Sequence, residues 1–306
     1  MGGRQPTVDL LGEDRAMTRL LATATRGPLA CLVTSLVATT LVLAACTGVG
    51  PGSERPSGSP RTGPTSSSPA EAASPAPAPR VGDCHRLSYD GAVAPTAGNR
   101  TVACGETHTA ETFQVGRLDT VVDGRLLAVD SDEVQEQIAT TCPQGLADYI
   151  GGTEEQRRLS MLRAVWFTPT LEQSDAGADW FRCDAVALAE DSRLLDLDAT
   201  LDGTLDTEAG RQRFGVCGTA EPGTATFRRV ACAEPHTWRA VRTVALPGPD
   251  YPGEQAAARA GERPCRDAAN AQAPDPLDFQ WGYEWPTAEQ WAAGQTWGVC
   301  WVPAPA

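Results

Sequence analysis

The stretch that decides the fold is Val230-Ala-Cys-Ala-Glu-Pro-His236, which has a close copy, Val102-Ala-Cys-Gly-Glu-Thr-His108, at an offset of 128 residues. Each copy lies inside a longer pattern of four cysteines, namely Cys84, Cys104, Cys142 and Cys183, and then Cys217, Cys232, Cys265 and Cys300. Both patterns end alike, at an offset of 117 residues, with Pro169-Thr-Leu-Glu-Gln173 before Trp180-Phe-Arg-Cys183 and Pro286-Thr-Ala-Glu-Gln290 before Trp297-Gly-Val-Cys300. The sequence therefore predicts two tandem copies of one module.

Residues 1–45 are typical of an export signal. Arg19 and Arg26 precede an apolar run, 29–43, which is short for a spanning helix and is followed by small residues. The acids before Met17 are unusual in such a segment and point to Met17 as an alternative start. Leu43-Ala-Ala-Cys46 resembles a bacterial lipobox, which predicts cleavage before Cys46 and a diacylglycerol and palmitate anchor on it. An ordinary signal peptide with an incidental cysteine, or an uncleaved anchor, is the alternative.

The composition limits the type of organism the chain comes from and the classes of partner it can bind. The chain has no lysine, so all 25 basic residues are arginine, a bias that indicates high-GC coding and an actinobacterial source. Residues 46–80 are rich in proline and serine and predict a disordered tether after the acylated cysteine. The net charge is −14, which argues against nucleic-acid binding because that binding depends on Lys and Arg. The same acidity repels anionic lipids, so membrane attachment has to come from the acyl chains.

The eight module cysteines predict disulfides, because an exported protein meets an oxidising compartment. Self-contained modules with one shared connectivity leave three possible arrangements. We expect the first cysteine to pair with the second and the third with the fourth, which gives Cys84–Cys104, Cys142–Cys183, Cys217–Cys232 and Cys265–Cys300. A zinc site is the competing interpretation, but the chain has no Cys-x-x-Cys or Cys-x-x-His pair.

Local patterns predict the strands of each module. Residues 100–104 and 112–118, and in the second copy 224–232 and 238–246, are expected to pair across the Cys-x-Glu-x-His turn. Strands at 180–188 and 297–302 return to the same sheets.

A helix is expected between the second and third strands of each module. In the first copy Asp130 and Glu133 suggest a capping box, and apolar residues recur every fourth position up to Leu146. Pro143 should kink this helix or start another, and its counterpart spans 254–271. Thr170 and Thr287 are expected to cap a further short helix, with Gln173 and Gln290 at the third helical position.

These elements predict an α+β fold, in which each module is a small antiparallel sheet with one or two helices. We assign residues 81–190 to module 1, 191–211 to the inter-module connection and 212–306 to module 2. Within the connection, the acidic run 196–203 superficially resembles a calcium loop but lacks the closing glutamate.

The recurring histidines are the candidate functional residues. His108 and His236 each follow a glutamate, Glu106 or Glu234, by two positions, an arrangement that can orient a general base or a metal ligand. The alternative is a turn histidine that bonds nearby backbone, which the shortage of further ligands favours. His85 has no counterpart and is expected to be exposed.

Tryptophans are the second candidate set. Trp180 and Trp297 recur and should pack in the core. Trp281, Trp285 and Trp291 crowd one region of module 2, where an exposed cluster would form a glycan or partner surface. The chain contains no nucleophile elbow, Walker or dinucleotide-binding motif, so neither an enzyme nor a cofactor is expected.

The tether, the Gly-x-Cys element, Val230-x-Cys-x-x-Pro-His236 and the Pro-Thr-x-Glu-Gln element ending in Trp-x-x-Cys resemble the actinobacterial septum-formation family. Module 1 departs from that pattern at Thr107, where proline is preferred. The resemblance implies an exported, membrane-associated protein whose biochemistry is undetermined. Our leading hypothesis is a non-enzymatic lipoprotein on the outer face of the cell membrane that binds a division or envelope component. A glycan- or solute-binding lipoprotein, and a His/Glu-dependent metal or hydrolytic protein, are the alternatives.

Overall fold

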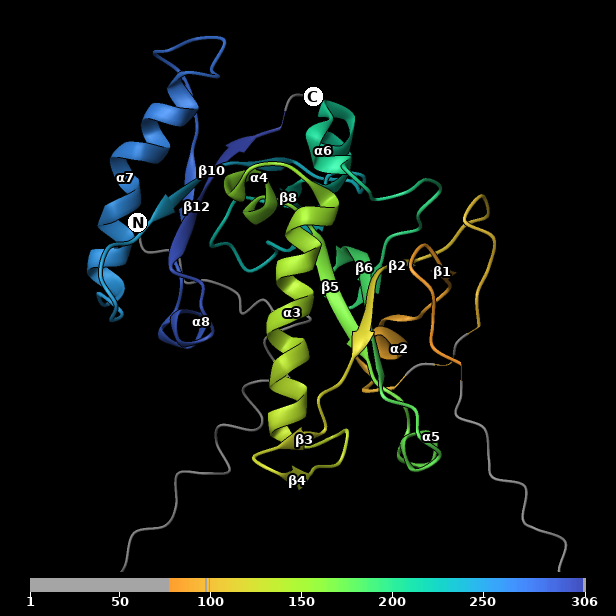
Figure 1. The fold of residues 1–306 in the computed structure, drawn as a ribbon. Helices are drawn as coiled ribbons and strands as arrows, with labels where there is room; N and C mark the ends of the chain where they lie inside the picture. The colour runs from red at the N-terminus through yellow and green to blue at the C-terminus, as the bar shows by residue number, and fades with distance from the viewer. Residues whose placement is uncertain (1–76, 97, 99, 305–306) are drawn as a thin grey trace, which may run out of the picture. The chain divides into compact units, whose positions relative to one another are not determined.

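The structure, a computed structural model, describes residues 77–96, 98 and 100–304 (Figure 1). The predicted export signal, Cys46 and residues 47–76 of the predicted tether lie outside the described residues. The described residues belong to one compact unit of the chain. They form a mixed α+β structure with two five-stranded antiparallel sheets, as the α+β prediction requires, and a further two-stranded sheet.

The first sheet has the strand order β1-β2-β6-β5, with β7 paired to β6. The elements of module 1 are β1 (Cys84–His85), α2 (Tyr89–Val93), β2 (Ala110–Arg117), the small β3 (Val121–Val122) and β4 (Arg125–Leu126) hairpin, α3 (Asp132–Ile150), α4 (Glu154–Arg158), β5 (Leu162–Phe167), α5 (Leu171–Asp175) and β6 (Trp180–Glu190). The connection supplies β7 (Arg193–Leu194), the 3-10 helix η1 (Thr204–Asp206) and α6 (Glu208–Phe214).

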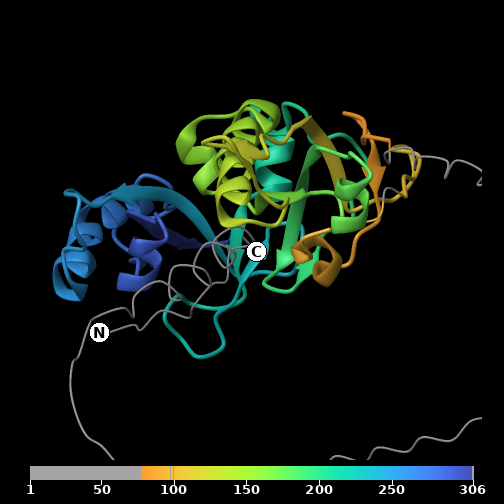
Figure 2. The same ribbon diagram turned by 60° about the horizontal axis from the view of Figure 1, so that its bottom comes forward.

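The second sheet has the order β11-β12-β10-β8-β9. Its elements are β8 (Val216–Gly218), β9 (Arg229–Ala231), β10 (Trp238–Ala245), α7 (Glu254–Asn270), β11 (Gly282–Glu284), α8 (Ala288–Ala292) and β12 (Trp297–Pro303). Helix α7 contacts β10, β11 and β12. Figures 1 and 2 both show it beside the second sheet. The order β8-β10-β12-β11 repeats the order β1-β2-β6-β5, so the duplication seen in the sequence is a duplication of topology.

Matching residues of the two copies occupy matching places in the sheets. Thr112 faces Asp184 and Ala240 faces Trp301, and each pair precedes a register shift, at Thr112/Gln114 and at Ala240/Arg242. The offsets of 128 along β2 and β10 and of 117 along β6 and β12 therefore identify structurally equivalent residues.

The strands that flank the Cys-x-Glu-x-His turn do not pair with each other, so this expectation is wrong. In module 2 β8 lies between β9 and β10 and pairs with both. In module 1 Cys84 pairs with Glu111 and forms a bridge to Val102 on its other side. The strand of the first cysteine thus lies between the two strands that flank the turn, and its backbone groups are satisfied on both edges. The turn therefore has to cross the width of that strand.

Helix α3 buries one face against its sheet, as the four-residue spacing predicts. Its buried residues are Val134, Ile138, Cys142, Leu146 and Ile150. The capping box expected at Asp130 and Glu133 is wrong, because Ser131 is the N-cap and makes no side-chain cap bond. The acids Asp132 and Glu133 stand instead in the first turn, where they complement the helix dipole. Pro143 lies inside one continuous helix and starts no second one.

Both short helices after the Pro-Thr-x-Glu-Gln element are capped as predicted. The Thr170 side chain accepts a hydrogen bond from the Gln173 N–H, and the Gln173 side chain accepts one from the Thr170 N–H. Thr287 and Gln290 repeat this reciprocal pair. Two otherwise unpaired backbone donors are thereby satisfied at each helix start.

Four disulfides join the elements, in the pairs Cys84–Cys104, Cys142–Cys183, Cys217–Cys232 and Cys265–Cys300. The first pair of each module links neighbouring segments of the sheet. The second pair links the long helix to the last strand, α3 to β6 and α7 to β12. This is the first-with-second and third-with-fourth arrangement.

The modules share one hydrophobic core, although the sequence suggested self-contained units. Phe214, Val216 and Trp301 belong to the same buried cluster as the module 1 core. The Met161 N–H donates to the Phe214 carbonyl at 2.7 Å. The Arg158 guanidinium lies 4.2 Å from the centre of the Trp297 ring. The two copies therefore pack against each other through shared buried apolar residues.

Tyr283 fills the space between α7 and β12. Side chains at Gly261 and Gly298 would collide with its ring, with Cβ atoms 2.2 and 2.3 Å from Tyr283 atoms. Its hydroxyl is buried and has no hydrogen-bond partner among the described residues. Burial raises the pKa of Tyr283 to about 12.

We therefore expect Tyr283→Phe to leave stability at pH 7 unchanged or slightly higher, because no hydrogen bond is lost. The wild type should lose stability as pH rises from about 10, the pKa of an unfolded tyrosine, towards 12, since the unfolded state releases its proton first. The variant should lose less. Urea unfolding at neutral and alkaline pH measures the difference, and identical alkaline losses in both proteins would contradict it.

Candidate functional site

The two recurring histidines occupy equivalent turns and bond to backbone. His108 Nδ1 lies 2.9 Å from the Glu106 carbonyl oxygen, and His236 Nδ1 lies 2.7 Å from that of Glu234. The carboxylate does not orient the imidazole in either turn; that of Glu234 instead pairs with Arg193 at 3.0 Å. His108 is fully buried, so its ring offers no surface to a substrate. The geometry is that of a turn histidine, the alternative to a general base or a metal ligand.

A metal site at His236 is chemically blocked. The ligand atoms of Cys217, Cys232 and His236 lie within 4.8 Å of one another, the one such group among the described residues. Both sulfur atoms, however, belong to the Cys217–Cys232 disulfide. Metal coordination by cysteine requires a thiolate, so the oxidised protein offers a single imidazole there.

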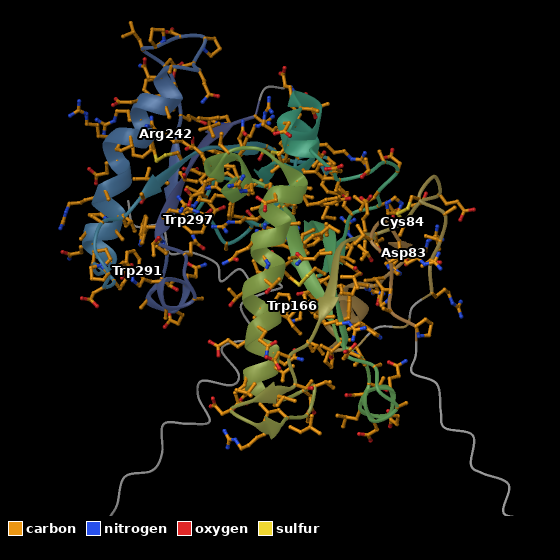
Figure 3. All side chains as sticks on the ribbon, viewed as in Figure 1. Asp83, Cys84, Trp166, Arg242, Trp291 and Trp297 are labelled. Carbon is orange, nitrogen blue, oxygen red and sulfur yellow. A yellow bond between two sulfur atoms is a disulfide. The ribbon has the colours of Figure 1, made fainter. Side chains whose placement is uncertain are left out.

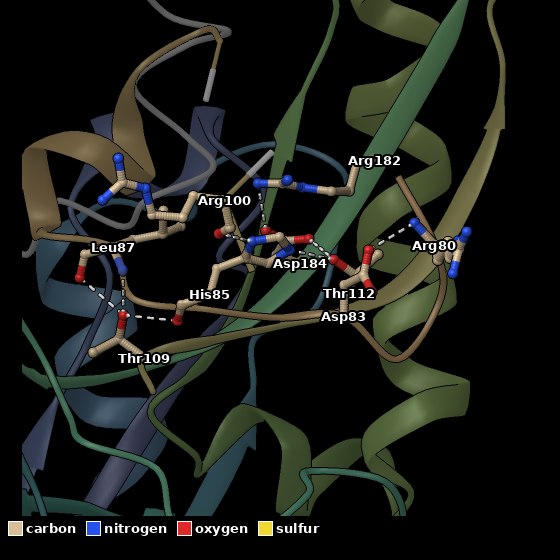
Figure 4. Close-up of polar contacts among 9 residues, drawn as sticks. All are labelled: Arg80, Asp83, His85, Leu87, Arg100, Thr109, Thr112, Arg182 and Asp184. Carbon is tan, nitrogen blue, oxygen red and sulfur yellow. Dashed lines mark hydrogen bonds and ion pairs between the residues drawn. The ribbon is translucent and has the colours of Figure 1, made fainter. Parts of the chain in front are cut away.

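His85 is buried, which corrects the expectation that it is exposed (Figure 4). Its Nδ1 lies 3.0 Å from the Arg100 carbonyl oxygen and its Nε2 lies 3.0 Å from Thr112 Oγ1. Strand β1 pairs with β2 on one side, and the segment at Val102 bridges Cys84 on the other, so the residue after Cys84 is covered rather than open to solvent.

A buried polar cluster continues from His85. Thr112 donates to the Asp184 carboxylate at 2.7 Å, and Arg182 Nη2 lies 3.0 Å from Asp184 Oδ2, with both charged side chains fully buried (Figure 4). The contact between Arg182 and Asp184 is an ion pair without hydrogen-bond geometry. Burial raises the pKa of the Asp184 carboxyl, and the charges of Arg182 and His85 partly oppose that rise.

The equivalent positions of module 2 hold no such cluster. They are occupied by Gly218, Ala240, Val299 and Trp301. Trp301 is fully buried and packs edge-on against Phe227 at 5.1 Å between ring centres. The same fold thus accommodates either polar or apolar side chains at these equivalent positions. The buried polar cluster of module 1 is part of the core.

The tryptophans of module 2 do not form an exposed patch, so that hypothesis loses its basis. Trp291 is 8% exposed, packs near Tyr251 and donates its indole N–H to the Pro249 carbonyl at 3.3 Å (Figure 3). Trp285 is half-buried beside the same small cluster. Trp281 is also half-buried and lies under the Arg266 guanidinium. These rings serve mainly to fix α7 and α8 on the second sheet.

A groove of about 940 Å³ lies beside the C-terminal end of α7. Its floor is made by β10 and β12, and its walls by α6 and by the loop after α7. The charged residues of its lining are two arginines, Arg211 and Arg239, and two acids, Glu208 and Asp278. Neither arginine forms an ion pair with a described residue. A volume of this size is typical of a ligand site.

No sequence motif predicted this groove or its arginines. The Arg211 guanidinium donates to the Leu205 carbonyl at 2.7 Å, and Arg239 donates to the Arg211 carbonyl at 3.4 Å. These bonds fix the positions of both cations in the groove lining. A usable signal was present, because Arg239 stands where module 1 has Glu111, a reversal of charge inside an otherwise repeated framework.

The fold and its four disulfides define a class of extracytoplasmic, disulfide-bonded α+β repeat proteins. No described helix is long and apolar enough to cross a membrane. The chain belongs to the Septum formation family, which it matches over residues 54–173 and 82–300. The two matches overlap and do not divide the chain between the modules. No curated protein and no solved structure shows a significant match.

Proposed function

We propose that the protein is a non-enzymatic binding protein of the cell envelope that acts in septum formation and uses the groove beside α7. The observation that carries this proposal is the open groove with two arginines that lack acidic partners, in a chain of the Septum formation family. A division or envelope component is the proposed occupant. The groove lies beside the second sheet, with Arg239 on β10, so binding is assigned to this side of the molecule.

The proposed role is tested by localisation and depletion in the source cell. A fluorescent fusion should concentrate at division sites, and depletion should give abnormal septa. Complementation should fail with Arg239→Glu and succeed with Arg242→Glu, an exposed arginine on the same strand that does not line the groove (Figure 3). Uniform fluorescence together with normal septa after depletion would remove the division role.

We also propose that a lipid on Cys46 holds the protein at the outer face of the membrane. The support is the Leu43-Ala-Ala-Cys46 motif and the tether that follows it. Metabolic labelling with a palmitate analogue should mark the wild type and leave Cys46→Ser unlabelled. An unlabelled wild type that leaves the membrane in high salt would overturn the anchor.

The rival function is a His/Glu-dependent metal or hydrolytic activity. Because His108 and His236 bond backbone carbonyls, we expect the double variant His108→Ala/His236→Ala to retain the cellular phenotype wherever it folds. Circular dichroism verifies folding, and complementation measures the phenotype. A folded double variant that fails to complement would favour the rival. The glycan- or solute-binding alternative has less support, because the three tryptophans are not exposed.

A further inference from the structure

In module 1 the equivalent of the groove is filled by the chain itself. The segment 195–205, which follows β7, crosses the sheet beside the C-terminal end of α3. Its leucines Leu197, Leu201 and Leu205 are at most 1% exposed. Leu197 exchanges backbone hydrogen bonds with His108, at 2.8 and 3.1 Å. This is how an extended peptide is held when it adds to the edge of a sheet.

Glu111 is the polar anchor of that segment. Its buried carboxylate accepts from Thr200 Oγ1 through one oxygen and from the Leu201 N–H through the other, both at 2.8 Å. The Tyr149 hydroxyl lies 3.3 Å from the same Thr200 hydroxyl, and the Gly203 N–H donates to the Tyr149 carbonyl at 2.8 Å. Leu146 and Ile150 belong to the same buried core as the leucines of the segment.

In module 2 the equivalent positions hold residues of different charge and size. Arg239 replaces Glu111, Gln272 replaces Tyr149, and the small residues Ala269 and Ala273 replace Leu146 and Ile150. All four line the open groove. The smaller side chains leave space for a ligand. The change from a carboxylate to a guanidinium turns the anchor position from a hydrogen-bond acceptor into a charged donor.

We propose that the groove of module 2 binds an extended peptide segment of a partner protein that carries a carboxylate side chain, with this carboxylate on Arg239 and apolar side chains over Ala269 and Ala273. The intramolecular segment of module 1 is the template for the backbone path. The reversed charge selects an acidic residue where module 1 takes Thr200, because a guanidinium binds a carboxylate with charge-assisted hydrogen bonds. This inference rests on the proposed function and names its ligand class.

The probes for a direct test are synthetic peptides with the sequence of residues 195–205. One carries Thr200→Asp, one carries Thr200→Arg, and one is unchanged. Fluorescence anisotropy with the purified, oxidised protein should show the Thr200→Asp peptide binding at least tenfold more tightly than the Thr200→Arg peptide. A charged hydrogen-bonded contact is worth about ten- to a hundredfold in affinity.

The matched variants are Arg239→Glu, Arg239→Gln and Arg242→Glu. Arg239→Glu should reverse the order of the charged peptides, which a misfolded protein would not do. Arg239→Gln keeps a hydrogen-bond donor but removes the charge. It should lower the affinity for the Thr200→Asp peptide without raising the affinity for the Thr200→Arg peptide. Arg242→Glu should behave as the wild type.

Equal affinities for the two charged peptides, or an order that Arg239→Glu leaves unchanged, would overturn the inference. So would a wild-type dimer that Arg239→Glu dissociates and that no peptide displaces, because a second copy would then occupy the groove. If no peptide binds but septal localisation still depends on Arg239, the peptide inference alone is overturned. Peptide binding with localisation independent of Arg239 would remove the division role instead.

Discussion

Reduction of the four disulfides is expected to unfold this protein at neutral pH. The pairs close stretches of 15 to 41 residues, and each should contribute about 3–4 kcal/mol by restricting the unfolded chain. Together these contributions match the entire free energy of unfolding of a typical domain, about 5–15 kcal/mol. Circular dichroism and tryptophan fluorescence before and after treatment with a phosphine reductant measure the effect.

Paired variants separate the individual bonds. Cys142→Ala/Cys183→Ala, which releases α3 from β6, should cost about 4 kcal/mol, and Cys217→Ala/Cys232→Ala about 3 kcal/mol. Urea unfolding of the oxidised variants gives both values. A reduced protein that keeps a cooperative transition with the same midpoint would show that the cores suffice without the disulfides.

Removal of one partner from the buried ion pair of module 1 is the second large effect. Arg182→Met leaves the Asp184 carboxylate without its cation at a fully buried position, and we expect the free energy of unfolding to fall by about 3–5 kcal/mol. The double variant Arg182→Met/Asp184→Leu should recover at least half of the loss, because module 2 fills the equivalent places with Val299 and Trp301.

This loss should depend on pH in a defined direction. Burial already raises the pKa of Asp184, and without Arg182 the folded protein holds that proton more tightly still. The unfolded carboxyl titrates near 3.9, so the variant loses stability as pH rises above that value and is closest to the wild type in acid. Urea unfolding of both proteins at pH 4.5 and pH 7.5 tests this, and an equal difference at both values would contradict it.

Local chemistry made much of the framework predictable. The Thr-x-x-Gln caps at Thr170 and Thr287, the buried face of α3 and the α+β class depend on residues close in the chain. Strand β5 was not predicted, because its run Leu162-Arg-Ala-Val-Trp-Phe167 is short and shows no clear alternation, and its burial comes from α3 and β6.

The candidate site depended on contacts that no local pattern encodes. Glu111 and its partners Thr200 and Leu201 are 89 and 90 positions apart. The burial of His85 likewise depends on Thr112 and Asp184, far along the chain. Comparison of the two copies identifies the framework that they share. The groove instead depends on positions at which they differ, namely Arg239, Ala269 and Ala273.

The core shared by the two modules has an evolutionary consequence. Phe214, Val216 and Trp301 of the second region are buried together with the core of the first, so deletion of either copy would uncover apolar surface on the survivor. Once the duplicated halves had adapted to each other in this way, reversion to a single copy would have been selected against. Each copy therefore supplies part of the surface that closes the core of the other.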